Sequence, residues 1–390
     1  MKNLLDFALG VGLFGLFTST IYTVMAMVAA IRFSRRQRHG IPGSFTPAVS
    51  LLKPVHGAEA GLEKHLATFF EQEYPDYEIL FCARQLDDPG LAAARCVAAR
   101  YPYIPVQFLA SGEPTLPNAK LLSLELMAGR SRHSILIISD SDVRVGRNYL
   151  RDVVAPFQDM RVGAVTCLYR GDASQGGIWS RIEAAAMSIE MSAGVLVAEM
   201  LEGMKFALGP TMAIRRKCLE EIGGFLPMGE YCSDDFLLGN QVAALGHRVV
   251  LSHYVIDHVV LHESFWSSMQ HQARWMKSTR FSRPKGHLGT ALTFSVPFGL
   301  LAAIAACLQH RPAIAAAALL WSIGARMLLA VTISQRVIRE KSAWPSVLLY
   351  PIRDMLAILF WIASYSSRTI FWRNEVFLLE SGGRMQRLNS

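Results

Sequence analysis

Apolar residues dominate the N-terminal end of the chain. Residues 4–31 carry a single charge, Asp6, and exceed the roughly 20 apolar residues that a helix needs to cross a bilayer. A secretory signal peptide is the alternative, but it would be shorter and would carry its basic residues before the apolar run. Here the arginines follow, at positions 32–38, so we expect an uncleaved anchor whose C-terminal end faces the cytoplasm.

Three more apolar runs occupy the C-terminal third of the chain, at residues 287–308, 312–333 and 345–365. The first two predict spanning helices joined by the short turn QHRP. The third contains Pro351 and the charged pair Arg353–Asp354, so a broken or re-entrant helix is as well supported there as a clean span. Four full spans would put the tail outside, whereas the arginines of the tail favour the inside. The sequence leaves the side of the tail open.

Residues 45–285 follow a shorter pattern, which is typical of alternating strands and helices. Short apolar runs predict strands at 48–55, 77–83, 105–110, 134–140, 162–169 and 247–253. Helical patterns lie at 61–73, 89–100, 118–130, 148–158 and 234–245. The segment therefore predicts an α/β domain. It has neither the G-x-G-x-x-G motif of dinucleotide-binding folds nor a Walker phosphate loop.

Acidic residues follow two of the predicted strands and open one predicted helix. Asp88 follows the second strand, Asp140 and Asp142 follow the fourth, and Asp234–Asp235 begin the last helix. Each group has an ordinary interpretation as a helix cap or a solvated turn. Ligands of open α/β sheets, however, bind beyond the carboxyl ends of strands. Two carboxylates as close as Asp140 and Asp142 also favour a divalent cation between them.

The net charge of +8 and the 52% hydrophobic content change the picture only slightly. The arginines cluster beside the membrane runs, where they meet anionic headgroups, and no zinc-finger spacing or aromatic-basic platform indicates a nucleic-acid partner. The six cysteines form no C-x-x-C pair, which predicts reduced packing residues. Four histidines between positions 253 and 271 match no zinc spacing and are set aside as a metal site.

Together with the segments VSLLKPVHG, PNAKLLSL and HQARW, these motifs resemble the ceramide glucosyltransferase family, glycosyltransferase family 21, which is similar to family 2. The resemblance covers nearly the whole chain and points toward bacterial members that glycosylate hopanoids. It implies an α/β fold of the GT-A type, a nucleotide-diphospho-sugar transferase domain with a mixed central sheet, between N-terminal and C-terminal transmembrane helices. It also implies an inverting transfer of N-acetylglucosamine or glucose from a UDP-sugar to the hydroxyl of a membrane lipid, most closely a hopanoid.

The family's signature of three aspartates corresponds to Asp88, Asp140 and Asp235. The resemblance implies that Asp88 binds uridine, that Asp140 and Asp142 hold Mg²⁺ or Mn²⁺ under the donor diphosphate, and that Asp235 is the catalytic base. We expect further donor contacts from three polar residues: Lys53, Asn118 and Lys120. A lysine binds phosphate as a point charge.

The last part of the signature, (Q/R)xxRW, corresponds to residues 271–275. The resemblance implies that Arg274 faces the leaving diphosphate and that Trp275 stacks on the acceptor or the sugar. His271 stands where the family has Gln or Arg, and its role stays open. An interfacial anchor is the alternative for Arg274 and Trp275, since both residue types favour the edge of a membrane.

Three other functions compete with a hopanoid glycosyltransferase. A ceramide glucosyltransferase would differ only in its lipid. A processive polysaccharide synthase would share the aspartates but needs more spanning helices and usually has Gln at position 271. A non-catalytic membrane scaffold or transporter would have no reason to retain every acidic position together with Arg274 and Trp275.

The sequence thus predicts a multi-pass protein of the inner (cell) membrane whose catalytic domain faces the cytoplasm. Its predicted parts are an anchor at 1–31, a basic linker at 32–44, the GT-A domain at 45–285, C-terminal membrane helices at 286–367 and a tail at 368–390. The expected partners are a UDP-sugar, a lipid acceptor and the bilayer. The sequence predicts neither the oligomeric state nor a choice between the two sugars.

Overall fold

The computed structural model describes residues 1–36, 45–261, 264–340, 342–372 and 375–388. The chain forms two compact units, each built from separate stretches of sequence. The first comprises Met1–Arg38, Gly171–Leu201 and Val260–Leu379, and the second comprises His39–Arg170, Glu202–Val259 and Glu380–Ser390. Most of the linker predicted at 32–44 lies outside the described residues.

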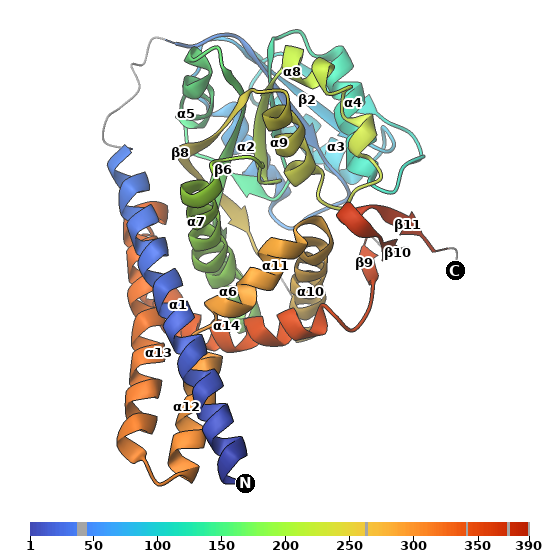
Figure 1. Cartoon of the computed structure of the whole chain (residues 1–390). Coiled ribbons are helices and arrows are strands. Elements are labelled where there is room, and N and C mark those ends of the chain that lie inside the picture. The colour runs from blue at the N-terminus through green and yellow to red at the C-terminus, as the bar shows by residue number, and fades with distance from the viewer. Residues whose placement is uncertain (37–44, 262–263, 341, 373–374, 389–390) are drawn as a thin grey trace. The chain divides into compact units, whose positions relative to one another are not determined.

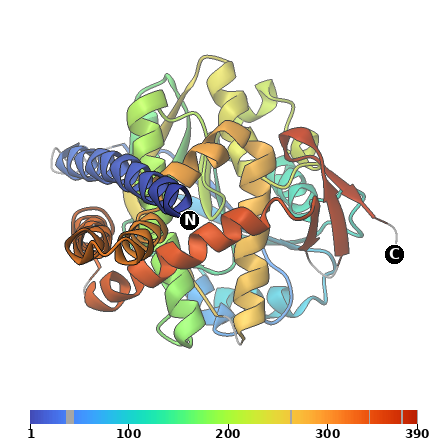
Figure 2. The ribbon, with the colours of Figure 1, turned by 60° about the horizontal axis from the view of Figure 1, so that its bottom comes forward.

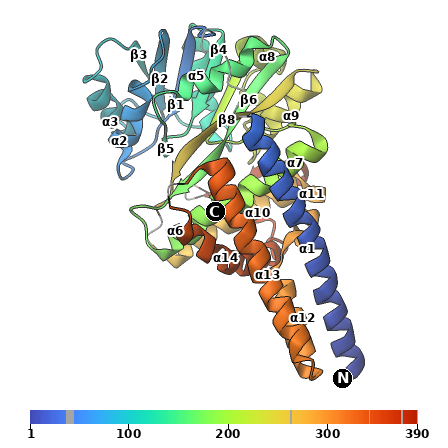
Figure 3. The ribbon, with the colours of Figure 1, turned by 90° about the vertical axis from the view of Figure 1, so that its left-hand side faces the viewer.

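A mixed eight-stranded sheet forms the centre of the α/β fold, in the order β3-β2-β1-β4-β7-β6-β8-β5 (Figure 3). The strands are β1 (Val49–Pro54), β2 (Tyr77–Ala83), β3 (Val106–Ala110), β4 (Ile135–Ser139), β5 (Val143–Arg144), β6 (Val162–Asp172), β7 (Thr211–Arg215) and β8 (Arg248–Val259). Strands β1 to β4 pair in parallel, whereas β7 is antiparallel to both β4 and β6. The mixed α/β sheet and all six predicted strands are confirmed.

Helices of the second unit cover this sheet. They are α2 (Leu62–Phe70), α3 (Pro89–Ala98), α4 (Ala119–Arg130), α5 (Tyr149–Val154), α8 (Arg216–Glu221) and α9 (Asp234–Ala244), with short 3₁₀ turns at Ala155–Gln158, Leu226–Met228 and Ser381–Gly383 and a C-terminal strand β11 (Met385–Arg387). One apolar core joins α4, α8 and α9 to alternate residues of β1, β2, β4 and β7, including Leu52, Leu80 and Ile138. The period of two along each strand explains this one-sided packing.

The strand order fixes where a ligand can bind in this sheet. From β1 the chain proceeds outward through β2 to β3 and then crosses back, so that β4 pairs with the other side of β1. In open α/β sheets the crevice at such a reversal, beyond the carboxyl ends of the strands, is where ligands bind. Residues that follow β1, β2 and β4 are therefore the first to consider.

In the first unit, α1 (Lys2–Arg36), α12 (Val296–Leu308) and α13 (Pro312–Ile333) run side by side (Figure 1). Small residues bring their backbones close: a Cβ added at Gly12 would lie 2.6 Å from the Ala302 nitrogen. The Gln309 amide donates to Asp6 over 3.0 Å, which places the turn between α12 and α13 beside the start of α1. Close packing of small residues is typical of helices in membranes.

The remaining elements of the first unit are α6 (Ile178–Ala185), α7 (Ser192–Glu202), α10 (Phe265–Ser282), α11 (Pro284–Thr290) and α14 (Trp344–Ala363), π-turns at Ala186–Met191 and Ser334–Ile338, a 3₁₀ turn at Ala291–Thr293, and strands β9 (Thr369–Trp372) and β10 (Glu375–Leu379). Helix α14 runs across α12 and α13 rather than alongside them (Figure 2). Pro351 does not end it. In the described residues, four helical stretches are long and apolar enough to cross a membrane: Lys2–Arg36, Ile178–Glu202, Pro312–Ile338 and Trp344–Ala363. The bent pair Pro284–Thr293 and Val296–Leu308 makes a fifth if it counts as one span.

One prediction about the membrane helices is wrong, and one helix boundary differs from the expected one. Residues 287–308 are not one continuous helix, because the chain bends by 45° between α11 and α12. At this break, the backbone N–H groups of Ser295 and Val296 donate to the Asp354 carboxylate, which satisfies the start of α12. The anchor helix also continues past residue 31 to Arg36, so the first arginines belong to the helix and not to a linker.

Candidate active site

Two lysines contact Asp140, one from the end of β1 and one from the start of α4. Lys53, at the end of β1, is completely buried, and its ammonium donates to the Asp140 carbonyl over 2.5 Å and lies 3.7 Å from the centre of the Phe69 ring. Lys120, in the first turn of α4, pairs with the Asp140 carboxylate over 2.5 Å. The sequence predicted all three residues at the donor site, and the structure brings them together.

The two lysines differ in their electrostatics. Burial lowers the pKa of Lys53 to about 7, although the charges of Asp140 and Asp142 oppose this shift. Burial also disfavours the charged form of Lys120, but the carboxylates around it, first that of Asp140 and then that of Asp234, outweigh burial and raise its pKa. Lys120 is therefore the permanent cation of this site.

Asp142 lies one residue beyond Ser141 and carries the second predicted metal ligand. Its Oδ1 atom is buried without a hydrogen-bond partner, and its Oδ2 atom lies 3.5 Å from Nε2 of His258 on β8. A buried carboxylate oxygen without a donor is a ligand of the kind that divalent cations take. In the described residues, however, Asp140, Asp142 and His258 do not bring three ligand atoms within 4.8 Å of one another, so the metal role of Asp140 and Asp142 stays a prediction. Sequence reasoning had set His258 aside, since only folding brings β8 next to Asp142.

Asp88 caps helix α3, as the ordinary interpretation of its motif predicted. Its Oδ1 atom accepts hydrogen bonds from the N–H groups of Gly90, at 2.7 Å, and Gly57, at 2.9 Å. The second bond ties the loop after β1 to the end of β2, at the edge of the sheet where ligands bind. The uridine contact of Asp88 stays a prediction.

Asp234 and Asp235 open helix α9, where the helix dipole favours carboxylates. Ser233, and not an aspartate, occupies the position before the helix. The Asp235 carboxylate accepts from the N–H groups of Gly209 and Phe236, each at 2.7 Å. Burial, reinforced by the charge of Asp234, raises the pKa of Asp235 to about 6. A carboxylate with such a pKa can accept a proton near neutral pH.

Asn118, the third predicted donor contact, connects these groups. Its side-chain amide donates to the Asp234 carboxylate over 3.0 Å and to the Tyr231 carbonyl over 3.3 Å. Lys120, two residues further along, pairs with Asp140. Asn118 and Lys120 therefore connect the Asp234 carboxylate to the Asp140 carboxylate, and their contacts with the donor stay predictions.

The motif around Arg274 lies on α10 in the first unit. The Arg274 guanidinium lies over the Trp372 ring, and the Trp275 ring lies 4.3 Å from that of His271. His271 in turn contacts the completely buried carboxylate of Glu183 through Nδ1, at 2.6 Å, and the Ser268 hydroxyl donates to the same carboxylate. The structure thus gives His271 a partner that the sequence did not predict. The catalytic roles of Arg274 and Trp275 stay predictions.

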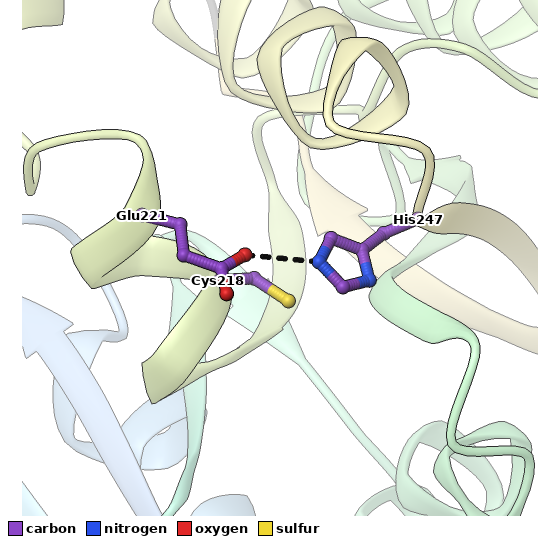
Figure 4. Close-up of side chains that lie close together, drawn as sticks. All are labelled: Cys218, Glu221 and His247. Carbon is purple, nitrogen blue, oxygen red and sulfur yellow. Dashed lines mark hydrogen bonds and ion pairs between the residues drawn. The ribbon is translucent and has the colours of Figure 1, made fainter.

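One further group of metal-ligating side chains lies elsewhere in the described part of the chain. Figure 4 shows Cys218, Glu221 and His247, in which the histidine ring contacts the carboxylate over 3.0 Å. Helix α8, which carries two of them, follows Arg215, and Arg215 pairs with Ile135 at the start of β4. Asp140 follows the other end of β4, so this group is not part of the candidate site.

The sequence matches the family described as Glycosyl transferase family 21 over residues 13–385. The chain belongs to this family. It is similar to ceramide glucosyltransferases 3 and 1 of Caenorhabditis elegans, with 22% identity over 366 and 380 residues; these alignments cover 92% and 95% of this chain and 79% and 80% of the relatives. Membership in the family makes the protein a glycosyltransferase.

A solved structure supports the fold independently. The mannosyltransferase PcManGT from Pyrobaculum calidifontis, in complex with GDP-Man and Mn²⁺, superposes with a TM-score of 0.50 at 18% identity, over 90% of this chain and 99% of that one. At this identity the likeness shows the GT-A fold and nothing about the substrates of this chain.

Proposed function

We propose that the protein transfers a sugar from a UDP-sugar to the hydroxyl of a membrane lipid, with inversion at the anomeric carbon. The observation that carries the proposal is the grouping of the Asp235 carboxylate, whose pKa is raised to about 6, with the Asp140–Lys120 ion pair. The same chain has helices long and apolar enough to cross a membrane, which supports a lipid acceptor. An alcohol is a poor nucleophile until a base removes its proton. Asp235 takes this proton as the acceptor oxygen attacks the sugar.

The other side of the site binds the donor and its leaving group. Asp88 accepts from the base of uridine, and Lys120 faces the negative charge that develops as UDP departs. Asp140 and Asp142 would hold a divalent cation, and a bound cation would supply positive charge to the leaving diphosphate. Lys53 donates a hydrogen bond to the Asp140 carbonyl and so fixes the backbone at Asp140.

The names of the relatives support ceramide as the acceptor better than the hopanoid that the sequence analysis put first. The hopanoid rests on resemblance alone. The direct experiment incubates the purified full chain in detergent with UDP-glucose or UDP-N-acetylglucosamine and with ceramide or a hopanoid alcohol. Mass spectrometry should detect a lipid carrying one sugar. Polymeric product would support a processive synthase, and a failure even to hydrolyse the donor would support a scaffold.

We place the second unit, called the catalytic unit below because it carries Asp140 and Asp235, on the cytoplasmic side of the inner membrane. The support is the arginines at the end of α1, among them Arg32 and Arg36, which favour the cytoplasmic face. Cys96 is exposed on the catalytic unit, whereas Cys82 is buried and is a poor probe. An impermeant thiol reagent should leave Cys96 unmodified in intact cells and label it after permeabilisation. Labelling in intact cells would reverse the orientation.

A further inference from the structure

The segment Glu380–Ser390, called the tail below, belongs to the catalytic unit, although the membrane helices separate it from the rest of that unit in sequence. It pairs with the loop Gly229–Ser233, which leads into Asp234. Tyr231 and Arg384 form an antiparallel bridge. The Cys232 N–H donates to the Gly383 carbonyl over 3.0 Å, and the Met385 N–H donates to the Glu230 carbonyl over 2.6 Å.

Side chains and backbone conformation reinforce this pairing. The Arg384 guanidinium and the Glu230 carboxylate form an ion pair of 2.8 Å, about half exposed on each side. The turn before the pairing residues has φ of 80° at Gly382 and 84° at Gly383, a conformation that other L-residues rarely adopt. The two glycines therefore allow the tail to turn onto the loop.

The opposite side of the same loop is tied to the candidate active site. The Asn118 N–H donates to the Gly229 carbonyl over 2.9 Å. The Asn118 side chain, almost completely buried, donates to the Tyr231 carbonyl and to the Asp234 carboxylate. Hydrogen bonds thus run without a gap from the tail, through the loop, to the acidic pair.

We propose that the tail residues Gly383, Arg384 and Met385 are positioning residues that hold the loop Gly229–Ser233 and so place Asp234 and Asp235 for the acceptor. The loop has the tail on one side and Asn118 on the other. Without the tail, the Cys232 N–H and the Glu230 carbonyl lose their partners, and the loop can move. The donor contacts of Asp88 and Asp140 come from other strands and do not depend on this loop. The proposal rests on the proposed function only in assigning Asp234 and Asp235 to the acceptor.

A pair of variants at one position tests the proposal in the full chain. Met385→Pro removes the N–H that bonds to Glu230, whereas Met385→Ala removes the side chain and keeps that bond. Misplacing a reacting group by about 1 Å can cost about 10²-fold in rate. We expect kcat to fall about 10- to 100-fold further in Met385→Pro than in Met385→Ala, with equal UDP affinity by calorimetry.

Two further measurements keep the outcome clear. Hydrogen exchange should show faster exchange at Cys232 in Met385→Pro, whatever the activity of the enzyme. Glu230→Arg and Arg384→Glu should each lower kcat, and the double variant, which restores the ion pair with its charges reversed, should recover kcat. Equal kcat in Met385→Pro and Met385→Ala, or a parallel loss of kcat and UDP affinity, would overturn the proposal. Absence of transfer by the unchanged protein would instead count against the proposed function.

Discussion

Two groups of buried charges, one in each unit, are built on different principles. In the first unit, which contains the long apolar helices and is called the membrane unit here, Arg326 pairs with Asp354 over 3.0 Å and Arg353 pairs with Glu190 over 3.1 Å. The free end of Asp354 also accepts two N–H groups at the start of α12. Two cations thus meet two anions. These contacts join α13 to α14 and α14 to the helical turn at Ala186–Met191.

In the catalytic unit the balance is unequal. Four carboxylates, those of Asp140, Asp142, Asp234 and Asp235, share Lys120 and a second lysine, Lys53, whose pKa is lowered to about 7. Burial, together with the charge of Asp234, raises the pKa of Asp235. The excess of negative charge favours binding of a cation. The comparison teaches that balanced charges serve the fold, whereas unbalanced charges are available for chemistry.

The largest effect is expected from removing the cation that we propose the unbalanced group binds. EDTA should abolish transfer, and Mg²⁺ or Mn²⁺ should restore it. Asp142→Asn should need more metal for the same rate, because it removes one negative ligand. Transfer assays over a range of metal concentrations measure this. Full activity in EDTA would mean that the lysines alone neutralise the leaving group.

A large loss of stability, rather than of activity, should follow from breaking the balanced group. Arg326→Met leaves Asp354 buried without its cation, which should cost about 3–5 kcal/mol in the free energy of unfolding. The matched control is Arg36→Met, because the Arg36–Glu199 pair is exposed and such pairs contribute about 0–1 kcal/mol. Denaturation in detergent compares them. Equal losses would show that Arg326 does not hold the fold.

A smaller effect concerns pH. Because Asp235 must be ionised to act as a base, the transfer rate should fall about tenfold per pH unit below a pKa of about 6. Asp234→Asn should move this limb to lower pH, since the charge of Asp234 raises the pKa of its neighbour. The contribution of Asp235 to the free energy of unfolding depends on pH in the opposite sense. A carboxyl group whose pKa is raised on folding favours the fold at low pH and loses that contribution as pH rises through about 6. An acid limb unchanged by Asp234→Asn would assign it to another group.

Much of the catalytic fold could be predicted from the sequence because the parallel strands β1, β2 and β4 are buried and mostly apolar runs. Strand β7 escaped prediction. Its five residues, TMAIR, follow Gly-Pro and lead directly into α8, so they lack the length and the flanking turn of the other strands. Its pairing with β4 is the point where the sheet changes from parallel to antiparallel.

In the candidate site, too, some residues could be predicted from the sequence and others could not. Asp88, Asp140 and Asp235 each lie beside the end of an element, where the sequence placed them, and their roles stay predictions. His258, Glu183 and the tail residues could not be found in that way, since their partners lie far away in sequence: Asp142, His271 and the loop before Asp234. No local pattern marks such contacts.

The most direct test of the contrast compares Asp235→Asn with Asp354→Asn, measuring transfer rate and thermal midpoint on the same preparations. Asp235→Asn should lose about 10²–10⁴-fold in rate while keeping its thermal midpoint and its affinity for UDP. Asp354→Asn should lower the thermal midpoint, because it leaves Arg326 buried without a carboxylate. Substantial transfer by Asp235→Asn would contradict the account.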